Sequence, residues 1–371
     1  MTRAHSCEIS VPESLLRLGQ LCEEALGRRP NSPMIIDEPF ARFAVDRHQV
    51  GALLHAVVKT GRHDVSPGAH RLLAASYHDS AGRRKATLMH LDRIALEFSA
   101  LRIPWMTLKG AAQAGQLYDD PVWRSSADID LLVARDQFAE AFDALHNMGF
   151  VPAYPRMPNS RILRELVLGV VRDVTLIARD DPRCAIELHS RLFMARDHRA
   201  NAIKLDLQDA HVPAPIVGPA LAFYIIAHGA LSLWVRLKWL IDLVPLFDRL
   251  GADEKIEARE YARRSGAENS FAAGLLLLRV IFRSASLVPL DTWLDEKQRQ
   301  PAVRRRLQRY AASIGLEHEA GLSPFDNALI SLQSNWLLFE ANSTRVSLIA
   351  RASGSSLARR FANFLSVSLQ N

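Results

Sequence analysis

Apolar side chains in the first quarter of the chain recur every three or four positions. The spacing is clearest at Leu15, Leu18 and Leu21, and it places such residues on one face of a helix. The same spacing predicts three further helices, over residues 48–58, directly after 67–68 and over 82–101. We therefore expect residues 1–98 to form a helical region that acts as a scaffold or lid.

The pattern changes near residue 102, where short apolar runs alternate with turn residues. Runs of this length, bounded by Gly, Pro or Asp, are typical of strands. The predicted strands cover residues 103–108, 127–133, 170–178 and 184–189, and the predicted helices between them cover 111–118 and 136–149. Residues 99–215 should therefore form a core with a small mixed β-sheet.

Helical spacing returns after this core. The predicted helices cover residues 219–249, 253–265, 269–285, 291–313, 324–340 and 343–369. The whole pattern predicts an α+β protein, in which a small mixed sheet is flanked by the N-terminal helical region and by a C-terminal helical domain over residues 216–371.

One segment of the C-terminal domain is apolar enough to suggest a membrane span. Residues 218–235 carry only two strongly polar side chains, His228 and Ser232, and about 18 apolar residues is near the lower limit for crossing a bilayer. Arg236 and Lys238 follow in what the pattern predicts to be the same helix. We therefore expect a buried helix and no membrane span.

The composition excludes several classes of protein. With 371 residues, 49% hydrophobic and 23% charged, the chain can bury a large core and is neither disordered nor collagen-like. Its three cysteines form no Cys-x-x-Cys pair and no disulfide framework, which predicts a cytoplasmic location. The net charge of +6 suits a nucleotide or other phosphate ligand. No dense Lys/Arg stripe is present, so we do not expect nucleic acid as a partner.

The clearest candidate chemistry lies in the predicted strand over residues 127–133. Asp128 and Asp130 are two positions apart, so both carboxylates face one side of a strand while Ile129 and Leu131 face the other. Two carboxylates this close repel each other unless a cation lies between them, and divalent cations with oxygen ligands are the usual partners. A pair of such ions could activate an attacking oxygen and stabilise a leaving one.

Polar residues on both sides of this strand extend the pattern. Lys109 and Gly110 end the preceding strand at a predicted helix start, where glycine lets a phosphate approach the backbone and the helix end favours an anion. Donors that could hold a triphosphate precede the acidic pair, at Arg124, Ser125 and Ser126. In a later strand Glu187 and His189 share one face, and a third carboxylate there would complete a triad for two metal ions.

These motifs together resemble a known family. The chain contains LKG at 108–110, LYDDP at 117–121, Arg124, DIDLLV at 128–133, IELH at 186–189 and an HGA…W-x-R-L-K-W-L-x-D element over 228–242. Their order is similar to the signature of an uncharacterised bacterial nucleotidyltransferase family within the DNA polymerase beta-type nucleotidyltransferase superfamily. The likeness covers residues 100–245, and the combination is far more specific than any single motif.

The resemblance implies a polymerase-beta-type palm sheet that carries a metal triad. It implies transfer of a nucleoside monophosphate from an NTP, with ATP the expected donor, to an acceptor hydroxyl or other nucleophile. Two Mg²⁺ ions would assist the transfer, and Mn²⁺ could substitute for them. By the same resemblance Asp128 and Asp130 bind both ions, and Glu187 holds the catalytic one. Two positions depart from the superfamily: Lys109-Gly110 stands in place of Gly-Ser, and Glu187 in place of the more common Asp.

Several positions have both a functional and a structural interpretation. Arg124 could contact the triphosphate or form a surface salt bridge. His189 could act as a general base, orient a neighbour or be an ordinary hydrogen-bonded strand histidine. His228 could line the nucleotide pocket or belong to the core. Lys238 could reach the nucleotide or form an intrahelical pair with Asp242, four positions away.

The sequence leaves alternative functions open as well. Instead of transferring an NMP to a small molecule, peptide or protein, the same fold could serve as a non-catalytic nucleotide-binding or regulatory module. A γ-phosphate transferase is disfavoured because no HRD or DFG motif is present. A DxD glycosyltransferase would need a longer series of alternating strands and helices. No motif identifies the acceptor.

Overall fold

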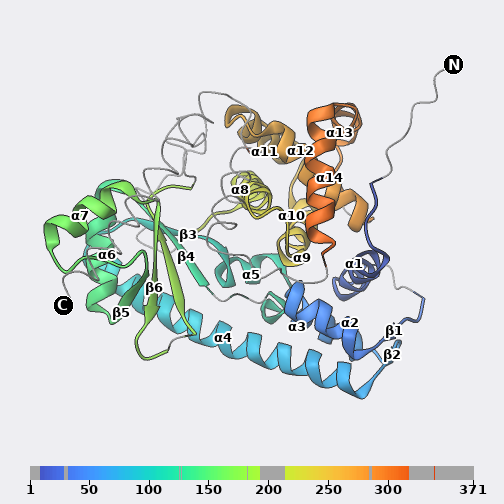
Figure 1. The fold of residues 1–371 in the computed structure, drawn as a ribbon, viewed down its shortest axis with the longest axis horizontal. Coiled ribbons are helices and arrows are strands. Elements are labelled where there is room, and N and C mark those ends of the chain that lie inside the picture. Colours follow the sequence, from blue (N-terminus) through green and yellow to red (C-terminus); the bar gives the residue numbers. More distant parts are fainter. Residues whose placement is uncertain are drawn as a thin grey trace. The chain divides into compact units, whose positions relative to one another are not determined.

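A computed structural model describes residues 9–28, 32–124, 126, 128–181, 183–192, 214–283, 286–316 and 338 (Figure 1). The chain divides into two compact units. The first, which we call the helical unit, comprises Met1–Ser76, Ala222–Arg263 and Ala267–Leu338. The second, the sheet unit, comprises Tyr77–Leu221 and Arg264–Gly266 in the described part of the chain. The helices predicted over 324–340 and 343–369 lie outside the described residues, apart from residue 338.

The sheet unit holds all the strands of the larger sheet. Its elements are most of α4 (Pro67–Ala100), β3 (Trp105–Gly110), α5 (Ala111–Leu117), a 3-10 turn (Pro121–Trp123), β4 (Asp128–Val133), a second 3-10 turn (Arg135–Gln137), α6 (Phe138–Asn147), β5 (Phe150–Tyr154), α7 (Arg161–Val170), β6 (Asp173–Ala178), β7 (Ala185–His189) and β8 (Ala214–Pro215).

The helical unit contains two very short strands and a set of helices. Its elements are α1 (Glu13–Ala25), β1 (Ile35–Ile36), α2 (Glu38–Arg42), a π-helical turn (Phe43–Arg47), α3 (Gly51–Val58), β2 (Asp64–Val65), most of α8 (Gly218–Leu231), α9 (Leu237–Ile241), α10 (Leu243–Arg249), α11 (Ala252–Arg264), α12 (Glu268–Ile281), α13 (Asp291–Gln298) and α14 (Pro301–Ile314).

The larger sheet is mixed. In the described part of the chain its strand order is β5-β6-β7-β4-β3-β8. Strand β4 runs parallel to β7 and antiparallel to β3, while β6 is antiparallel to both β5 and β7. Parallel neighbours cannot be joined by a tight turn, and the chain passes from β4 to β7 through α6, β5, α7 and β6. The mixed sheet flanked by helices confirms the predicted α+β class.

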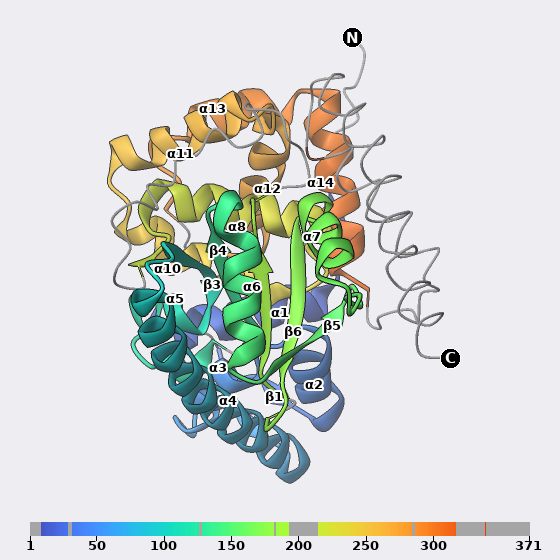
Figure 2. The ribbon, with the colours of Figure 1, turned by 90° about the vertical axis from the view of Figure 1, so that its left-hand side faces the viewer.

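Alternate residues of the strands build the core of the sheet unit. Helices α4, α6 and α7 contribute to the same apolar cluster, and Figure 2 shows α6 lying across this face of the sheet. In β4, β6 and β7 the residues of the cluster are at most 3% exposed: Ile129, Leu131, Val133, Val174, Leu176, Ala178, Ile186 and Leu188. Successive side chains of a strand point to opposite faces, so the acidic residues between them lie on the other face.

Helix α4 is continuous where the pattern predicted two helices. Gly82 lies in its interior, and a glycine there costs only about 1 kcal/mol relative to alanine. The helix also holds the segment that leads into β4. Tyr77 Oη donates to Asp120 Oδ2 at 2.9 Å, and Ser80 Oγ donates to the carbonyl oxygen of Val122 at 2.6 Å.

The prediction of one helix over residues 219–249 was wrong, because the chain there forms α8, α9 and α10. The break follows α8, where Leu233 and Trp234 adopt φ angles of 51° and 54°. The Trp234 indole is fully buried. An added Cβ at Gly229 or Gly274 would lie 2.4 or 3.1 Å from its ring. Packing of this ring stabilises a turn that apolar periodicity alone does not reveal.

The break also bears on the apolar run. Helix α8 has 14 residues, and no helix in the described segments combines the length and apolar character needed to cross a bilayer. Two smaller differences concern other elements. The helix predicted over 291–313 divides before Pro301 into α13 and α14. Strand β5 was not predicted, since its Pro152 cannot donate to a strand ladder and disfavours a strand assignment.

A buried histidine fixes the start of α9 within the helical unit. Nδ1 of His48 accepts a hydrogen bond from the Leu237 N–H at 3.2 Å, and its carbonyl oxygen accepts one from the Lys238 N–H at 3.2 Å. Burial, assisted by the neighbouring Arg47 charge, lowers the pKa of His48 from 6.5 to about 3. The imidazole is therefore neutral and serves as a hydrogen-bond acceptor.

Candidate active site

Strands β4 and β7 bring the predicted acidic residues together. They are parallel neighbours, and their register places Asp130 opposite Glu187 and Leu132 opposite His189. Side chains alternate between the two faces along each strand. The face opposite the apolar cluster therefore carries Asp128, Asp130, Glu187 and His189. The predicted triad is thus assembled on two adjacent strands that are distant in sequence.

Asp130 is the most enclosed of the three carboxylates, with 1% of its side chain exposed. Its Oδ2 accepts a hydrogen bond from the Lys109 ammonium at 2.5 Å, and its Oδ1 lies 3.3 Å from Nε2 of His189. Burial by itself would raise the pKa of Asp130, but Lys109 and His189 outweigh it and hold that pKa well below its usual range. Asp130 therefore carries a negative charge that two neighbours stabilise.

His189 faces two carboxylates from a buried position. Its Nε2 lies 3.3 Å from Asp130 Oδ1 and 3.6 Å from Glu187 Oε2. Burial favours the neutral ring, but the hydrogen bonds with Asp130 and Glu187 outweigh it and raise the pKa of His189. This nitrogen can donate a hydrogen bond to the carboxylates or, when deprotonated, coordinate a cation.

Asp128 and Glu187 form the open side of the cluster. Their side chains are 31% and 34% exposed. The Ser126 hydroxyl lies 3.0 Å from the carbonyl oxygen of Asp128 and 3.2 Å from its Oδ1, while the Lys109 ammonium lies 3.5 Å from its Oδ2. A substrate arriving from solvent would therefore meet these two carboxylates before Asp130.

The donor set fits one divalent cation. Asp130, Glu187 and His189 each offer one ligand atom, and these three atoms lie within 4.8 Å of one another. Among the residues that the structure describes, no other group of three or more such side chains could hold a metal ion. Carboxylate oxygens suit Mg²⁺ and Mn²⁺, and the imidazole nitrogen favours a transition metal. A second ion between Asp128 and Asp130 does not fit this arrangement, because the Lys109 ammonium lies there.

Gly110 brings the end of β3 against Ser126. Its φ is +89°, a conformation that favours glycine, and an added Cβ would lie 2.6 Å from Ser126 Oγ. The ladder between β3 and β4 also shifts register between Thr107 and Gly110. The close approach holds the Ser126 hydroxyl beside Asp128, at the point where β3 ends and α5 begins.

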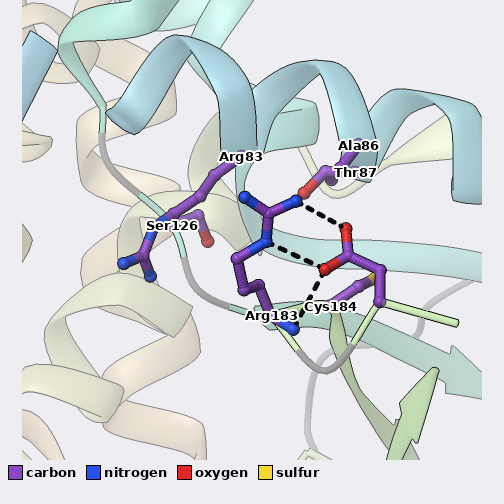
Figure 3. A pocket seen from close by; sticks show the side chains of 7 residues that line it. Arg83, Ala86, Thr87, Ser126, Arg183 and Cys184 are labelled. Atoms are coloured by element: carbon purple, nitrogen blue, oxygen red, sulfur yellow. Dashed lines mark hydrogen bonds and ion pairs between the residues drawn. The ribbon is translucent and has the colours of Figure 1, made fainter. Parts of the chain in front are cut away.

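A small pocket adjoins the acidic cluster at Ser126 (Figure 3). Arg83 of α4 and Arg183 of the turn between β6 and β7 are among the residues that line it. Both guanidinium groups have partners, since Arg83 Nε lies 2.8 Å from Asp79 Oδ2 and Arg183 Nε lies 2.9 Å from Asp181 Oδ1. The sequence did not point to these arginines, because no motif connects the two distant segments.

The other predicted nucleotide-binding residues fall in different places. Arg124 is 6% exposed and ends the short helix before β4, while Ser125 lies outside the described residues. His228 and Lys238 belong to the helical unit, where the rings of His228 and Trp239 meet edge-on with centroids 5.2 Å apart. The roles of His228 and Lys238 in nucleotide binding stay predictions.

Comparison with known proteins gives a single family assignment. No curated protein and no solved structure matches the chain. Residues 38–283, more than half of the chain, match a family described as uncharacterised nucleotidyltransferase. The matched segment contains β3, β4 and β7, which carry Lys109 and the acidic cluster. The chain therefore belongs to this nucleotidyltransferase family, as its motifs led us to expect.

Proposed function

We propose that the protein is a metal-dependent nucleotidyltransferase. It moves a nucleoside monophosphate from an NTP to an acceptor hydroxyl on a small molecule, peptide or protein, and ATP is the expected donor. The pairing of β4 with β7 supports this function most directly, because it sets Asp130 opposite Glu187. The chain in which this pairing occurs belongs to a nucleotidyltransferase family. In-line displacement at phosphorus requires mainly positioning and charge neutralisation, for which a cluster of carboxylates and one lysine is suited.

The acidic cluster would hold the divalent cation. Asp130, Glu187 and His189 supply the ligands for one Mg²⁺ or Mn²⁺ ion, whereas the superfamily resemblance implies two ions. A bound ion would supply Lewis-acid stabilisation of charge on the phosphates. Glu187, about a third exposed, can also accept the proton of the attacking hydroxyl.

Binding of the nucleotide is proposed to involve residues around the end of β3. The Lys109 ammonium lies beside Asp128 and Asp130, where its charge can neutralise a neighbouring phosphate. The chain can approach a phosphate closely at Gly110. We assign Arg124, Ser125 and Ser126 to the nucleotide site on the basis of the motif resemblance. The polar lining of the pocket at Ser126 suits a charged or hydroxyl-bearing substrate group.

A non-catalytic nucleotide-binding module is the second candidate. The observation that favours it is the ion pair of Lys109 with Asp130, because a neutralised carboxylate needs no metal ion. Such a module would bind a nucleotide without turnover. Its partners would be other proteins, and loss of the acidic residues would leave those interactions intact.

Parallel incubations with α-³²P-ATP and γ-³²P-ATP test the proposed function. Each contains Mg²⁺ or Mn²⁺ and a host-cell extract as the source of acceptor. The variants are Asp128→Asn and Glu187→Gln, and Glu140→Gln, an exposed acid of α6, is the matched control. We expect label from the α position with the unchanged protein and the control, and at least about a hundredfold less with the two site variants.

Two results would contradict the proposal. Label from the γ position alone would identify a phosphotransferase. Full α-label transfer by Asp128→Asn and Glu187→Gln would separate the activity from the acidic cluster. Nucleotide binding by equilibrium dialysis without any transfer, across several acceptor extracts, would favour the non-catalytic module.

A further inference from the structure

An ammonium group lies between the two carboxylates of the Asp-x-Asp motif. Lys109 Nζ is 2.5 Å from Asp130 Oδ2 and 3.5 Å from Asp128 Oδ2. The lysine side chain is 11% exposed and Asp130 is 1% exposed. A carboxylate this deeply buried requires a charged partner, so Lys109 is a structural part of the cluster.

The ammonium and a bridging metal ion would compete for the same oxygens. A Mg²⁺ or Mn²⁺ ion shared by Asp128 and Asp130 would have to lie about 2.1 Å from each ligand oxygen. The Lys109 ammonium already approaches the same Oδ2 atoms of both residues. A divalent cation at that place would also be repelled by the positive charge of Lys109.

The second oxygen of Asp130 faces a different set of groups. Oδ1 lies 3.3 Å from Nε2 of His189, and the same nitrogen lies 3.6 Å from Glu187 Oε2. The carboxylate of Asp130 therefore has one oxygen for the ammonium and one for a site formed with Glu187 and His189.

The charges agree with this division. Asp128, Asp130 and Glu187 bring three negative charges, of which the Lys109 ammonium offsets one. A single divalent cation offsets the remaining two. A second divalent ion would leave the protein side of the cluster with an excess of positive charge.

We propose that the protein binds one catalytic divalent cation, through Asp130, Glu187 and His189, and that the Lys109 ammonium replaces the second metal ion at the Asp128–Asp130 edge. This inference rests on the proposed function and changes its metal requirement. The imidazole ligand further predicts tighter binding of Mn²⁺ than of Mg²⁺, because nitrogen ligands favour transition metals. Lys109 then contacts the phosphates that a second ion would otherwise neutralise.

Counting bound Mn²⁺ tests the inference independently of turnover. Free Mn²⁺ is measured by electron paramagnetic resonance during titration of the full chain, with and without a non-hydrolysable ATP analogue. The variants are Lys109→Met, which removes the charge, and Lys109→Arg, which keeps it. Lys85→Met, at an exposed lysine of α4, is the matched control, and circular dichroism checks that each variant is folded.

We expect one protein-bound Mn²⁺ per chain for the unchanged protein, Lys109→Arg and Lys85→Met, and two for Lys109→Met. Two bound ions in the unchanged protein would overturn the inference, and so would a single ion in a folded Lys109→Met. Neither result affects the proposed function if α-label is still transferred. Absence of both Mn²⁺ binding and α-label transfer would instead remove the proposed function itself.

Discussion

Nε2 of His189 lies 3.3 Å from Oδ1 of Asp130, across two strands that are parallel neighbours in the sheet. Strand pairing, and not proximity along the chain, creates this contact. The apolar residues on the opposite face of β4 and β7 hold the two strands in register. Substitutions at the polar face should therefore change the chemistry of the cluster while leaving the pairing of the two strands in place.

Replacing His189 with alanine should weaken Mn²⁺ binding. The imidazole supplies one of three proposed ligands, so we expect the affinity to fall by at least about tenfold. His146→Ala changes an exposed histidine of α6 and should leave the affinity unchanged. Titration of Mn²⁺ followed by electron paramagnetic resonance measures both variants. An unaltered affinity in His189→Ala would exclude the imidazole as a ligand.

Removing the Asp130 carboxylate should cost more stability than removing that of Asp128. Asp130→Ala leaves the Lys109 charge without its buried partner, and breaking such a pair costs about 3–5 kcal/mol. Asp128 is 31% exposed, so Asp128→Ala should cost less than about 1 kcal/mol. Urea unfolding gives both values.

A double variant separates the charge effect from simple loss of packing. Combining Asp130→Leu with Lys109→Met replaces the ion pair with apolar groups and should recover most of the lost stability. If the double variant were as unstable as Asp130→Ala, the buried lysine charge would not be the source of the penalty.

Gly110→Ala should be more harmful than Gly149→Ala. Both glycines have positive φ angles, +89° and +97°, so alanine costs about 1–3 kcal/mol of backbone strain at either position. At Gly149 nothing lies within 4 Å of the added Cβ, whereas at Gly110 it would lie 2.6 Å from Ser126 Oγ. This collision should add about 1–3 kcal/mol and move the Ser126 hydroxyl away from Asp128. We therefore expect Gly110→Ala to lose more unfolding free energy and more nucleotide affinity than Gly149→Ala. Equal losses in the two variants would mean that the close approach of Gly110 to Ser126 is unimportant.

Gly229→Ala and Gly82→Ala should have opposite effects on stability. Alanine is the better helix former by about 1 kcal/mol, and Gly82 in α4 has open space around it, so that variant should be stabilised. At Gly229 the added Cβ would lie 2.4 Å from the Trp234 ring. The ring is buried and cannot move freely, so we expect a net loss of about 1–3 kcal/mol. Thermal unfolding of the two variants compares them directly; stabilisation by Gly229→Ala would contradict the packing of Trp234.

His48 should make the helical unit sensitive to acid. Its pKa is about 3 in the folded protein against 6.5 ordinarily, so below pH 6.5 the unfolded chain binds a proton that the folded chain does not. The stabilising contribution is therefore complete above pH 6.5 and declines as the pH falls toward 3, by up to about 1.4 kcal/mol per pH unit.

The variant His48→Asn isolates this effect. Its amide oxygen can accept the Leu237 N–H in place of Nδ1 but has no proton to gain. We expect its unfolding free energy, measured in urea between pH 7 and 4, to depend less steeply on pH than that of the unchanged protein. Identical slopes would show that another group causes the acid sensitivity.

The sequence alone determined the local elements of the site. Period-two alternation placed Asp128 with Asp130, and Glu187 with His189, on one face of their strands, and β4 and β7 begin within one residue of the predicted positions. Such patterns are readable because side-chain direction along a strand depends only on backbone geometry. The motif order likewise led to the nucleotidyltransferase family that residues 38–283 match.

Tertiary structure alone decided how these elements combine. The pairing of β4 with β7 sets Asp130 opposite Glu187, and nothing local to either strand specifies its neighbour. The place of the Lys109 ammonium between two aspartates, and the turn at Trp234 that interrupts an apolar run, depend on contacts between residues separated along the chain. Burial and charge pairing are properties of the folded protein, and they determine which of the predicted groups can bind a metal ion.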